Sequence, residues 1–288
     1  YGEAFSGYTS LTSIIIPDSV TNIGEWAFLG CTSLTSINVN ENNKYYKSIN
    51  GNLYSKDGKT LIQYAIGKTE TLFTIPNGVT TIGNSAFRGC TSLTSITILE
   101  KVTSIGYYAF YDCSSLTSIT IPDSVTSIKG DAFYGCTSLE RIEVGEANAA
   151  YISDSGILYN KDKTKIIIVP LSIKGDITIS DGVTTIEEST FEYCTSLTNI
   201  TIGGNVTSIG GRAFYNCSSL TNVTIPDSVT SIGWCVFENC SSLTRITIPD
   251  SVTSIGESAF RSCSSLTTIN YKGSKEQWDA ISLSLIHI

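Results

Sequence analysis

The stretch from Leu243 to Ser265 reads Leu-Thr-Arg-Ile-Thr-Ile-Pro-Asp-Ser-Val-Thr-Ser-Ile-Gly-Glu-Ser-Ala-Phe-Arg-Ser-Cys-Ser-Ser, and it is the cleanest copy of a 23-residue unit that recurs along the 288-residue chain. Positions 1, 4, 6, 10, 13, 18 and 21 of the unit are apolar in nearly every copy. A fixed period of this length indicates a solenoid, in which stacked units bury a continuous core that no single unit could bury alone. We therefore predict a repeat solenoid fold.

Each unit is expected to contain two strands. The β-branched residues at positions 1–6 predict a first strand, Pro-Asp-Ser at 7–9 predicts a turn, and Val-Thr-Ser-Ile-Gly at 10–14 predicts a short second strand. Ala-Phe-x-x-Cys at 17–21 suits a single helical or 3₁₀ turn. We expect parallel, in-register first strands about 4.8 Å apart along one curved rod. Their predicted starts are Leu11, Leu34, Glu70, Leu93, Leu116, Leu139, Lys174, Leu197, Leu220, Leu243 and Leu266.

Each turn should contact only its neighbours, which predicts a single domain spanning residues 1–288. Two turns are enlarged, at about residues 40–69 and 145–173. Apolar runs flank Asp57-Gly58 in the first and Asp162-Lys163 in the second, so each predicts a β-hairpin, which we expect to project from the solenoid. About residues 271–288 are predicted to cap the last turn. Ser274 and Gln277 there form a capping-box pattern, followed by a short helix from Lys275 to about Leu283.

Charge and composition argue against several functions. The net charge of −8 opposes a nucleic-acid partner, which requires clustered Lys and Arg. No apolar run approaches the roughly 18 residues that span a bilayer, so we expect no membrane insertion. The single histidine, His287, lies at the end of the chain, which leaves a Ser-His or His-metal site without a centre. We expect no enzyme activity, no cofactor and no metal. We also expect a monomer, and the first residues of the sequence begin in the middle of a 23-residue repeat.

The cysteines follow the repeat. Cys235 lies out of phase, and the other eight occupy position 21: Cys31, Cys90, Cys113, Cys136, Cys194, Cys217, Cys240 and Cys263. Free cysteine behaves as a small, readily buried apolar residue, so a column of buried thiols is the favoured interpretation. Disulfides between neighbouring turns and a metal site remain as alternatives.

The repeat, Ile-Pro-x-Ser-Val-Thr-Ser-Ile-Gly-x-x-Ala-Phe-x-x-Cys-x-Ser-Leu-Thr, resembles the Treponema-type leucine-rich repeat of the BspA-like surface proteins. Residues 156–164 are similar to an interrupting segment of that family, and residues 271–281 are similar to its closing segment. The resemblance implies a right-handed leucine-rich repeat solenoid with a parallel β ladder. It also implies a secreted or cell-surface protein of a host-associated bacterium or a mucosal protozoan, which adheres to extracellular-matrix or cell-surface proteins. The family brings no catalytic motif.

The outward positions 2, 3 and 5 of the first strand form the candidate binding face. They are mostly Thr, Ser and Asn, so a surface without a ligand in a structural spacer is the alternative, and ice binding is a remote one. Charge enters at two strands, and Arg is enriched at interface hot spots. The candidate residues are Thr94, Thr97, Thr117, Thr120, Glu140, Arg141, Glu143, Thr198, Asn199, Thr201, Thr221, Asn222, Thr224, Thr244, Arg245 and Thr247. Asp227 and Asp250 could share Ca²⁺, although local turn capping explains them better.

Overall fold

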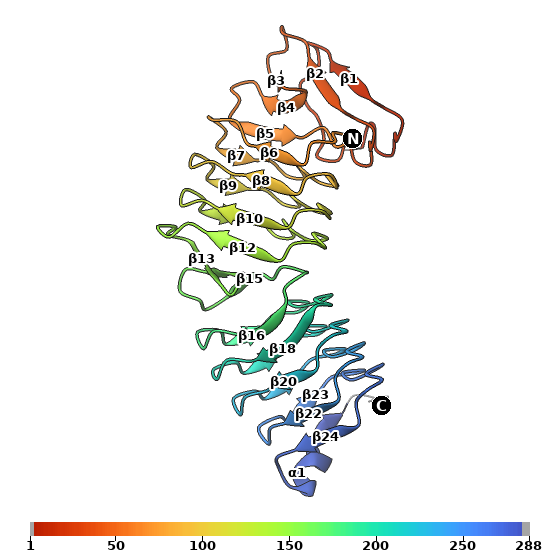
Figure 1. Ribbon diagram of the computed structural model, residues 1–288, viewed down its shortest axis with the longest axis vertical. Coiled ribbons are helices and arrows are strands. Elements are labelled where there is room, and N and C mark those ends of the chain that lie inside the picture. The colour runs from red at the N-terminus through yellow and green to blue at the C-terminus, as the bar shows by residue number, and fades with distance from the viewer. Residues whose placement is uncertain (1–2, 284–288) are drawn as a thin grey trace. The chain divides into compact units, whose positions relative to one another are not determined.

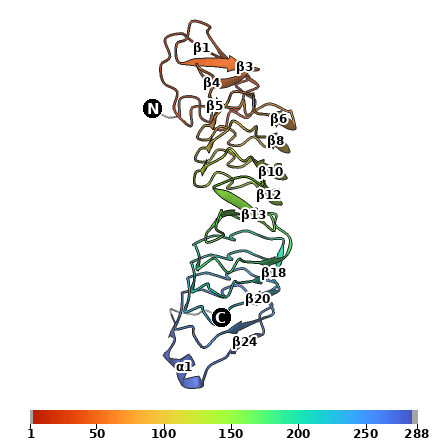
Figure 2. The ribbon, with the colours of Figure 1, turned by 90° about the vertical axis from the view of Figure 1, so that its left-hand side faces the viewer.

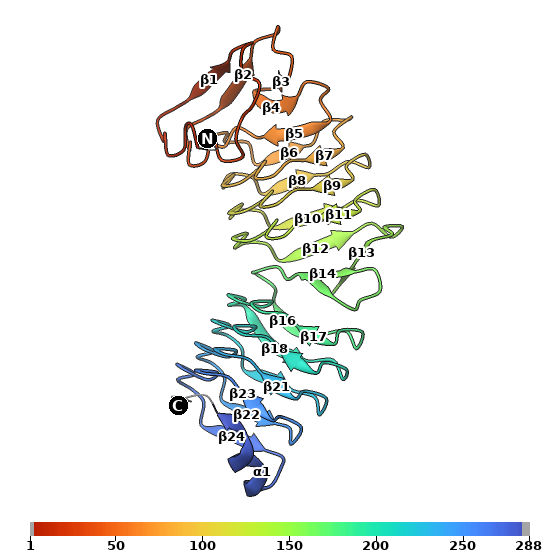
Figure 3. The same ribbon diagram turned by 180° about the vertical axis from the view of Figure 1, so that it is seen from behind.

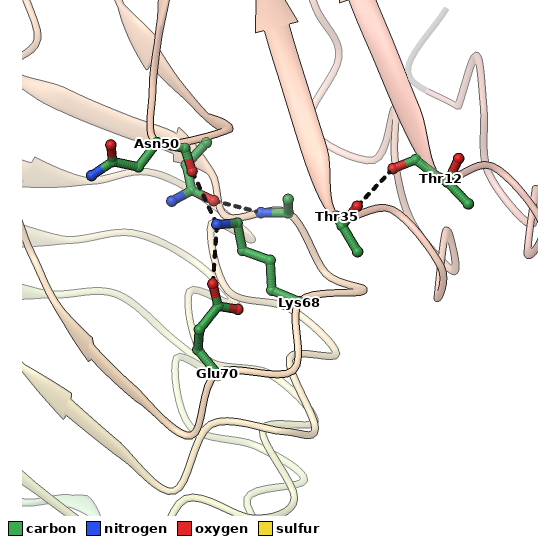
Figure 4. Close-up of polar contacts among 7 residues, drawn as sticks. Thr12, Thr35, Asn50, Lys68 and Glu70 are labelled. Carbon is green, nitrogen blue, oxygen red and sulfur yellow. Dashed lines mark hydrogen bonds and ion pairs between the residues drawn. The ribbon is translucent and has the colours of Figure 1, made fainter.

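The computed structural model describes residues 3–283, and the chain divides into two compact units, Tyr1–Ala150 and Tyr151–Ile288. Within each unit, parallel strands of successive turns lie side by side (Figure 1, Figure 3). Figure 2 shows from the side how the chain of each unit winds through these turns. The fold is therefore the predicted parallel-strand solenoid, whereas a single domain over residues 1–288 stays a prediction.

In the first unit the first strands form two parallel sheets. One sheet pairs β1 with β2, and the other has the order β12-β10-β8-β6. The strands are β1 (Ser13–Ile16), β2 (Ser36–Val39), β6 (Leu72–Thr74), β8 (Ser95–Thr97), β10 (Ser118–Ile121) and β12 (Arg141–Val144). Ser118 lies opposite Ser95 and Arg141, so this sheet is in register at the 23-residue period.

The second strands of this unit join the first enlarged turn in a six-stranded sheet of order β11-β9-β7-β5-β4-β3. Its strands are β3 (Tyr46–Ile49), β4 (Asn52–Ser55), β5 (Thr60–Gln63), β7 (Thr81–Ile82), β9 (Ser104–Ile105) and β11 (Ser127–Ile128). The predicted hairpin is present as β4–β5, and a second hairpin, β3–β4, turns at Asn50 and Gly51, both with positive φ. The expectation that this segment projects from the solenoid is wrong, because β5 pairs with β7 and lies within the ladder.

The second unit begins with the antiparallel sheet of the other enlarged turn and continues with regular turns. Its sheets are β13-β14-β15, β16-β18-β20, β22-β24 and β17-β19-β21-β23-β25. The strands are β13 (Tyr151–Asp154), β14 (Ile157–Asn160), β15 (Ile166–Ile168), β16 (Gly175–Thr178), β17 (Thr185–Ile186), β18 (Leu197–Thr201), β19 (Ser208–Ile209), β20 (Asn222–Thr224), β21 (Ser231–Ile232), β22 (Arg245–Ile248), β23 (Ser254–Ile255), β24 (Thr268–Tyr271) and β25 (Ser282–Leu283).

All eleven predicted first strands are present among residues 3–283, and most begin at position 3 of the unit. Their ladder is interrupted, however, rather than continuous. In the first unit the break falls between β2 and β6, where the enlarged turn intervenes; in the second it falls between β20 and β22.

The predicted helical or 3₁₀ turn at Ala-Phe-x-x-Cys is wrong in its local structure: this side of the solenoid consists of hydrogen-bonded turns. Ser85 has a φ of 54°, and the amides of Ser85 and Phe87 donate to the carbonyl oxygens of Tyr107 (2.9 Å) and Ala109 (2.8 Å) in the next turn. A helix would keep these amides for its own carbonyl groups. Alternate amides therefore hold neighbouring turns together along a third side of the stack.

Two columns fill the core beneath these turns. Phe110 stacks between Phe87 and Phe133, with ring centroids 5.2 and 4.9 Å apart. The thiols are free, and seven of the eight at position 21 are buried, which confirms the column; Cys263, in the last regular turn, is partly exposed, as is Cys235. Most thiols of the column also have a polar role: Cys113 Sγ, for example, lies 3.1 Å from the carbonyl oxygen of Phe87 and donates to it. Burial raises the pKa of Cys113 well above its usual value, which keeps this donor protonated.

The C-terminal cap forms as predicted. Helix α1 (Lys275–Ala280) begins at Ser274, whose side chain accepts from the amide of Gln277 while the Gln277 side chain accepts from the amide of Ser274. Trp278 is half-buried against Tyr271, and Ile281 is buried. The helix is shorter than expected because Ser282–Leu283 continues the second-strand ladder as β25. The predicted cap residues 284–288, His287 among them, lie outside the described residues.

Candidate functional site

The predicted binding residues lie on the outward side of the first strands, in two separate groups. In the first unit they belong to β8, β10, β12 and the residues just before them: Thr94, Thr97, Thr117, Thr120, Glu140, Arg141 and Glu143. In the second they belong to β18, β20, β22 and the residues just before them: Thr198, Asn199, Thr201, Thr221, Asn222, Thr224, Thr244, Arg245 and Thr247. All are exposed or half-buried.

The threonines at position 2 work inside the ladder. Thr221 Oγ1 donates to the carbonyl oxygen of Thr198 (3.0 Å), Thr198 Oγ1 to that of Gly175 (3.1 Å), and Thr94 Oγ1 to that of Thr71 (3.1 Å). These hydroxyl groups bond one strand to its neighbour along the sheet edge. A ligand could reach their methyl groups and free lone pairs, but their first role is structural.

The charged positions differ between the units. In the first unit Arg141 Nε lies 3.1 Å from Glu143 Oε1, so much of the charge of both groups is already compensated. In the second unit Arg245 is exposed on β22 opposite Thr268 and forms no ion pair within residues 3–283. Arg245 therefore offers an available guanidinium group to a partner.

The Asn199 side chain is also fixed by its neighbours. Asn199 Nδ2 donates to Asp176 Oδ1, and Asn199 Oδ1 accepts from Thr221 Oγ1 (3.3 Å). This short chain of side chains joins β16, β18 and the residue just before β20. These hydrogen bonds order the first-strand face, and they occupy both polar atoms of the Asn199 side chain.

Aromatic and Arg side chains gather on the turn-bearing side of each unit, and the sequence prediction missed them. In the first unit the Arg88 guanidinium carbon lies 4.5 Å from the centre of the Tyr111 ring, which stacks on Tyr134 at 5.2 Å. In the second unit Arg212 lies 4.3 Å from the centre of the Tyr215 ring and pairs with Glu192. The available signal was Tyr, Trp and Arg at positions 15, 16, 19 and 20 of a unit otherwise rich in Ser and Thr.

Two large apolar side chains also lie on the strand side of the first unit. Ile15 and Leu72 are both 69% exposed, and they occupy positions 5 and 3 of their 23-residue repeats. A first-strand face described only as Thr, Ser and Asn is therefore incomplete. The sequence prediction did not single out Ile15 and Leu72, because an apolar residue, β-branched in the case of Ile15, is common in a strand.

Other candidate chemistry finds little support. Among residues 3–283 no group of three or more His, Cys, Asp or Glu side chains could hold a metal ion. Asp227, considered for Ca²⁺, lies 2.6 Å from Lys272 Nζ and forms an ion pair with it. Burial, with a hydrogen bond to Glu238, raises the pKa of the Cys235 thiol to about 11, so the off-phase cysteine is mostly protonated at neutral pH.

Fold and repeat pattern together agree with a known family. The model of the BspA type leucine-rich repeat region matches residues 1–60, 64–175 and 172–283, in six copies. The chain belongs to the BspA-type leucine-rich repeat family. Proteins of this BspA type and fold are generally not enzymes. In the part of the BspA-type chain that the structure describes, no helix combines the length and the apolar character that crossing a membrane needs.

Solved bacterial leucine-rich repeat structures resemble this BspA-type chain. A leucine-rich cell surface protein from Faecalibacterium prausnitzii is 30% identical, with a TM-score of 0.67 over 98% of this chain and 85% of that one. A leucine-rich repeat protein from Bacteroides ovatus is also 30% identical, with a TM-score of 0.57 over 98% of this chain and 76% of that one. The pneumococcal vaccine antigen PcpA, 21% identical with a TM-score of 0.64 over 92% of this chain and 69% of that one, shares the fold. No curated protein sequence matches the chain.

Proposed function

We propose that this BspA-type protein is a secreted or surface-displayed binding module, which holds an extracellular-matrix or cell-surface protein on its first-strand face. Leucine-rich repeat proteins typically mediate protein interactions, and a similar solved structure is described as a cell surface protein. The module needs no cofactor and acts as a monomer.

The observation that carries the proposal is the state of Arg245. It is exposed among threonines, and no carboxylate within residues 3–283 compensates its charge. Its neighbours Thr244 and Thr247 are exposed on the same strand face, and Thr244 is held by the hydrogen bond that its carbonyl oxygen accepts from Thr267 (3.2 Å). Arg is enriched at hot spots, which lie within surfaces of energetically neutral contacts. Arg245 would supply the strong contact, and the ordered threonines around it would supply the energetically neutral ones.

Binding of the whole chain to a panel of immobilised extracellular-matrix proteins tests the proposal. At a protein that retains the chain, Arg245→Ala should weaken binding by about thirtyfold, the loss of a hot-spot contact. Arg261→Ala is the matched control, because Arg261 is also exposed in the same unit but pairs with Glu238 on the turn side. Equal loss in both variants would refute the strand face as the binding surface.

The alternative is a structural spacer with no ligand of its own. The threonine hydroxyl groups that serve the ladder favour it, because they stabilise a sheet without any partner. Failure of every matrix and cell-surface protein to retain the chain would support the spacer.

A further inference from the structure

An open cavity of about 180 Å³ lies in the first unit, between its first turn and the first enlarged turn. Four apolar side chains from these two turns line it: Ile23, Phe28, Leu53 and Ile62. An apolar cavity of about 150 Å³ admits a benzene-sized ring. This cavity therefore has room for one ring and a short arm.

The cavity follows from how the first turn meets the enlarged turn. Residues 20–24 occupy the position of a second strand but form none. The amide of Ile23 donates instead to the hydroxyl oxygen of Tyr46 (3.1 Å). A side-chain contact thus replaces a backbone ladder between these two turns.

The polar groups of the cavity are mainly acceptors. Gln63 Nε2 is occupied, since it donates to the carbonyl oxygens of Tyr64 (2.9 Å) and Ala86 (3.4 Å), so the side chain offers Oε1. Asn84 Nδ2 donates to one oxygen of Glu25 (2.6 Å), which leaves the second carboxylate oxygen free. Glu25 forms no ion pair with any residue from 3 to 283. A ligand that brings donors and a positive charge would suit these groups.

A second observation points to a missing partner. A smaller cavity of about 10 Å³ shares Glu25, Phe28 and Gln63 with the larger one and is also lined by Ser85 and Arg88. Ser85 is 2% exposed, and its Oγ has no hydrogen-bond partner. Arg88 does not compensate Glu25, because its guanidinium group lies over the Tyr111 ring and makes no ion pair within the described chain. A buried hydroxyl without a partner is costly, and the smaller cavity has room for one water-sized group that could supply the bond.

We propose that this cavity binds a small arylalkylamine, a benzene-sized ring with a short arm that ends in a protonated amino group. The ring packs against Ile23, Phe28, Leu53 and Ile62. The ammonium group has three donors and no acceptor, so it suits Glu25 and Gln63 Oε1. No part of this binding uses the first-strand face.

Isothermal titration of the whole chain with phenethylamine tests the inference. We expect saturable binding at one site. Phenylacetate, which has the same ring and the opposite charge, and n-butylamine, which has the charge without the ring, should each bind at least about tenfold more weakly, as expected when one charge-assisted hydrogen bond or the apolar contact is lost. The wild-type chain alone is enough for this test. The proposal is overturned if phenethylamine does not bind, or if phenylacetate binds with the same affinity as phenethylamine.

Two variants assign the site. Glu25→Gln keeps an acceptor for Asn84 but removes the charge, and it should weaken phenethylamine binding at least about tenfold. Glu100→Gln, an exposed change elsewhere in the same unit, is the matched control and should leave the affinity unchanged. Ile62→Trp should fill the cavity and abolish binding while circular dichroism confirms the fold. Undiminished binding to Glu25→Gln would contradict the assignment.

Discussion

The two enlarged turns have corresponding sequences but join their neighbours differently. In the first, β5 pairs with β7, and the amides of Thr80 and Gly83 donate to the carbonyl oxygens of Lys59 and Leu61, both at 2.8 Å. In the second, β13–β15 form a sheet of their own, and within residues 151–283 no backbone hydrogen bond joins β15 to β17. The same insertion is therefore part of the ladder in one case and an interruption in the other.

Three pairs of corresponding residues explain the difference. Asn52 Oδ1 accepts from the amide of Ala65 (3.0 Å) in the first turn, whereas the second has Ile157 and Pro170 at these positions, and proline has no amide to donate. Beside them, Tyr64 in the first turn corresponds to Val169 in the second. The hydrogen bond from Ala65 to Asn52 and the large Tyr64 ring therefore keep the first insertion in register with the ladder. The apolar residues at these positions in the second insertion pack in the core but do not fix its register.

The largest expected effect is at Tyr64. The Tyr64 ring is buried and packs at a tilt against the Phe87 ring, with ring centroids 5.4 Å apart. The Tyr64 amide donates to the carbonyl oxygen of Ala86. Tyr64→Ala should lower the free energy of unfolding by about 4 kcal/mol, whereas Val169→Ala, which removes less from a half-buried site, should cost about 1 kcal/mol. Urea unfolding of both variants measures this.

Tyr64→Phe is the control for the ring. The Tyr64 hydroxyl is buried without a partner, so its removal should stabilise the protein by about 1 kcal/mol. Equal destabilisation by Tyr64→Ala and Val169→Ala would contradict the proposed difference between the two turns.

The two turns should respond alike at their beginnings. Asn43 Nδ2 donates to the carbonyl oxygens of Pro17 (2.7 Å) and Val20 (3.0 Å), and Asn148 Nδ2 repeats this arrangement with Pro122 (2.8 Å) and Val125 (3.0 Å). Asn43→Ala and Asn148→Ala should each cost about 3 kcal/mol, because buried carbonyl groups lose their donor. Thermal unfolding checks this, and a large difference between the two would show that the turns already diverge here.

Asn42→Ala is the control for this pair of variants. Asn42 is exposed beside Asn43, and its own side chain forms no hydrogen bond within the described residues. The change should stay within about 0.5 kcal/mol.

A smaller effect is expected at the hairpin turn of the first insertion. Gly58 has a φ of 78°, a conformation that costs a residue with a Cβ about 1 kcal/mol. The nearest obstacle to a Cβ is the end of the Lys47 side chain, which can move. Gly58→Ala should therefore destabilise the protein by about 1 kcal/mol in urea, and a loss several times larger would mean that Lys47 cannot yield.

Lys163, the counterpart of Gly58, should show the smallest change. It has a φ of 53°, so Lys163→Gly relieves about 1 kcal/mol of strain. The change also removes the ion pair with Asp154, at 2.7 Å, which is worth about 0.5 kcal/mol because both groups are partly exposed. At pH 7 the ion-pair loss offsets about half of the gain, so Lys163→Gly should stabilise the protein by only about 0.5 kcal/mol.

Acid should unmask the gain. The hydrogen bond from Lys163 lowers the pKa of Asp154, so the pair stabilises the fold above the unfolded carboxyl pKa of about 3.9 and is lost as the pH falls through the lower folded value. Near pH 2 Lys163→Gly should therefore be more stable than the wild type. A variant that is less stable at pH 2 than at pH 7, relative to wild type, would contradict the sign.

The sequence predicts what local patterns determine. The eleven first strands follow from β-branched residues at a fixed period, and the cap follows from Ser274 and Gln277. The prediction of a helical or 3₁₀ turn at Ala-Phe-x-x-Cys was wrong because buried Phe and Cys side chains suit either a helix or an irregular turn. The hydrogen bonds that decide between the two join residues 22 apart in the sequence. Asn50-Gly51 is a strong hairpin signal, but the sequence prediction placed a hairpin only at Asp57-Gly58. For the candidate site, the repeat places residues on a face, but only side-chain geometry shows that Thr221 serves the ladder and Arg245 stands free.

Amide hydrogen exchange tests the central claim, that the first insertion belongs to the ladder and the second does not. The account predicts strong protection at Thr80, Thr81 and Gly83, whose amides donate to β5 and the residue before it. It predicts fast exchange at the corresponding Thr184 and Thr185, which have no such donor bond to β15 within the described residues. Equal protection of the two sets of amides would contradict it.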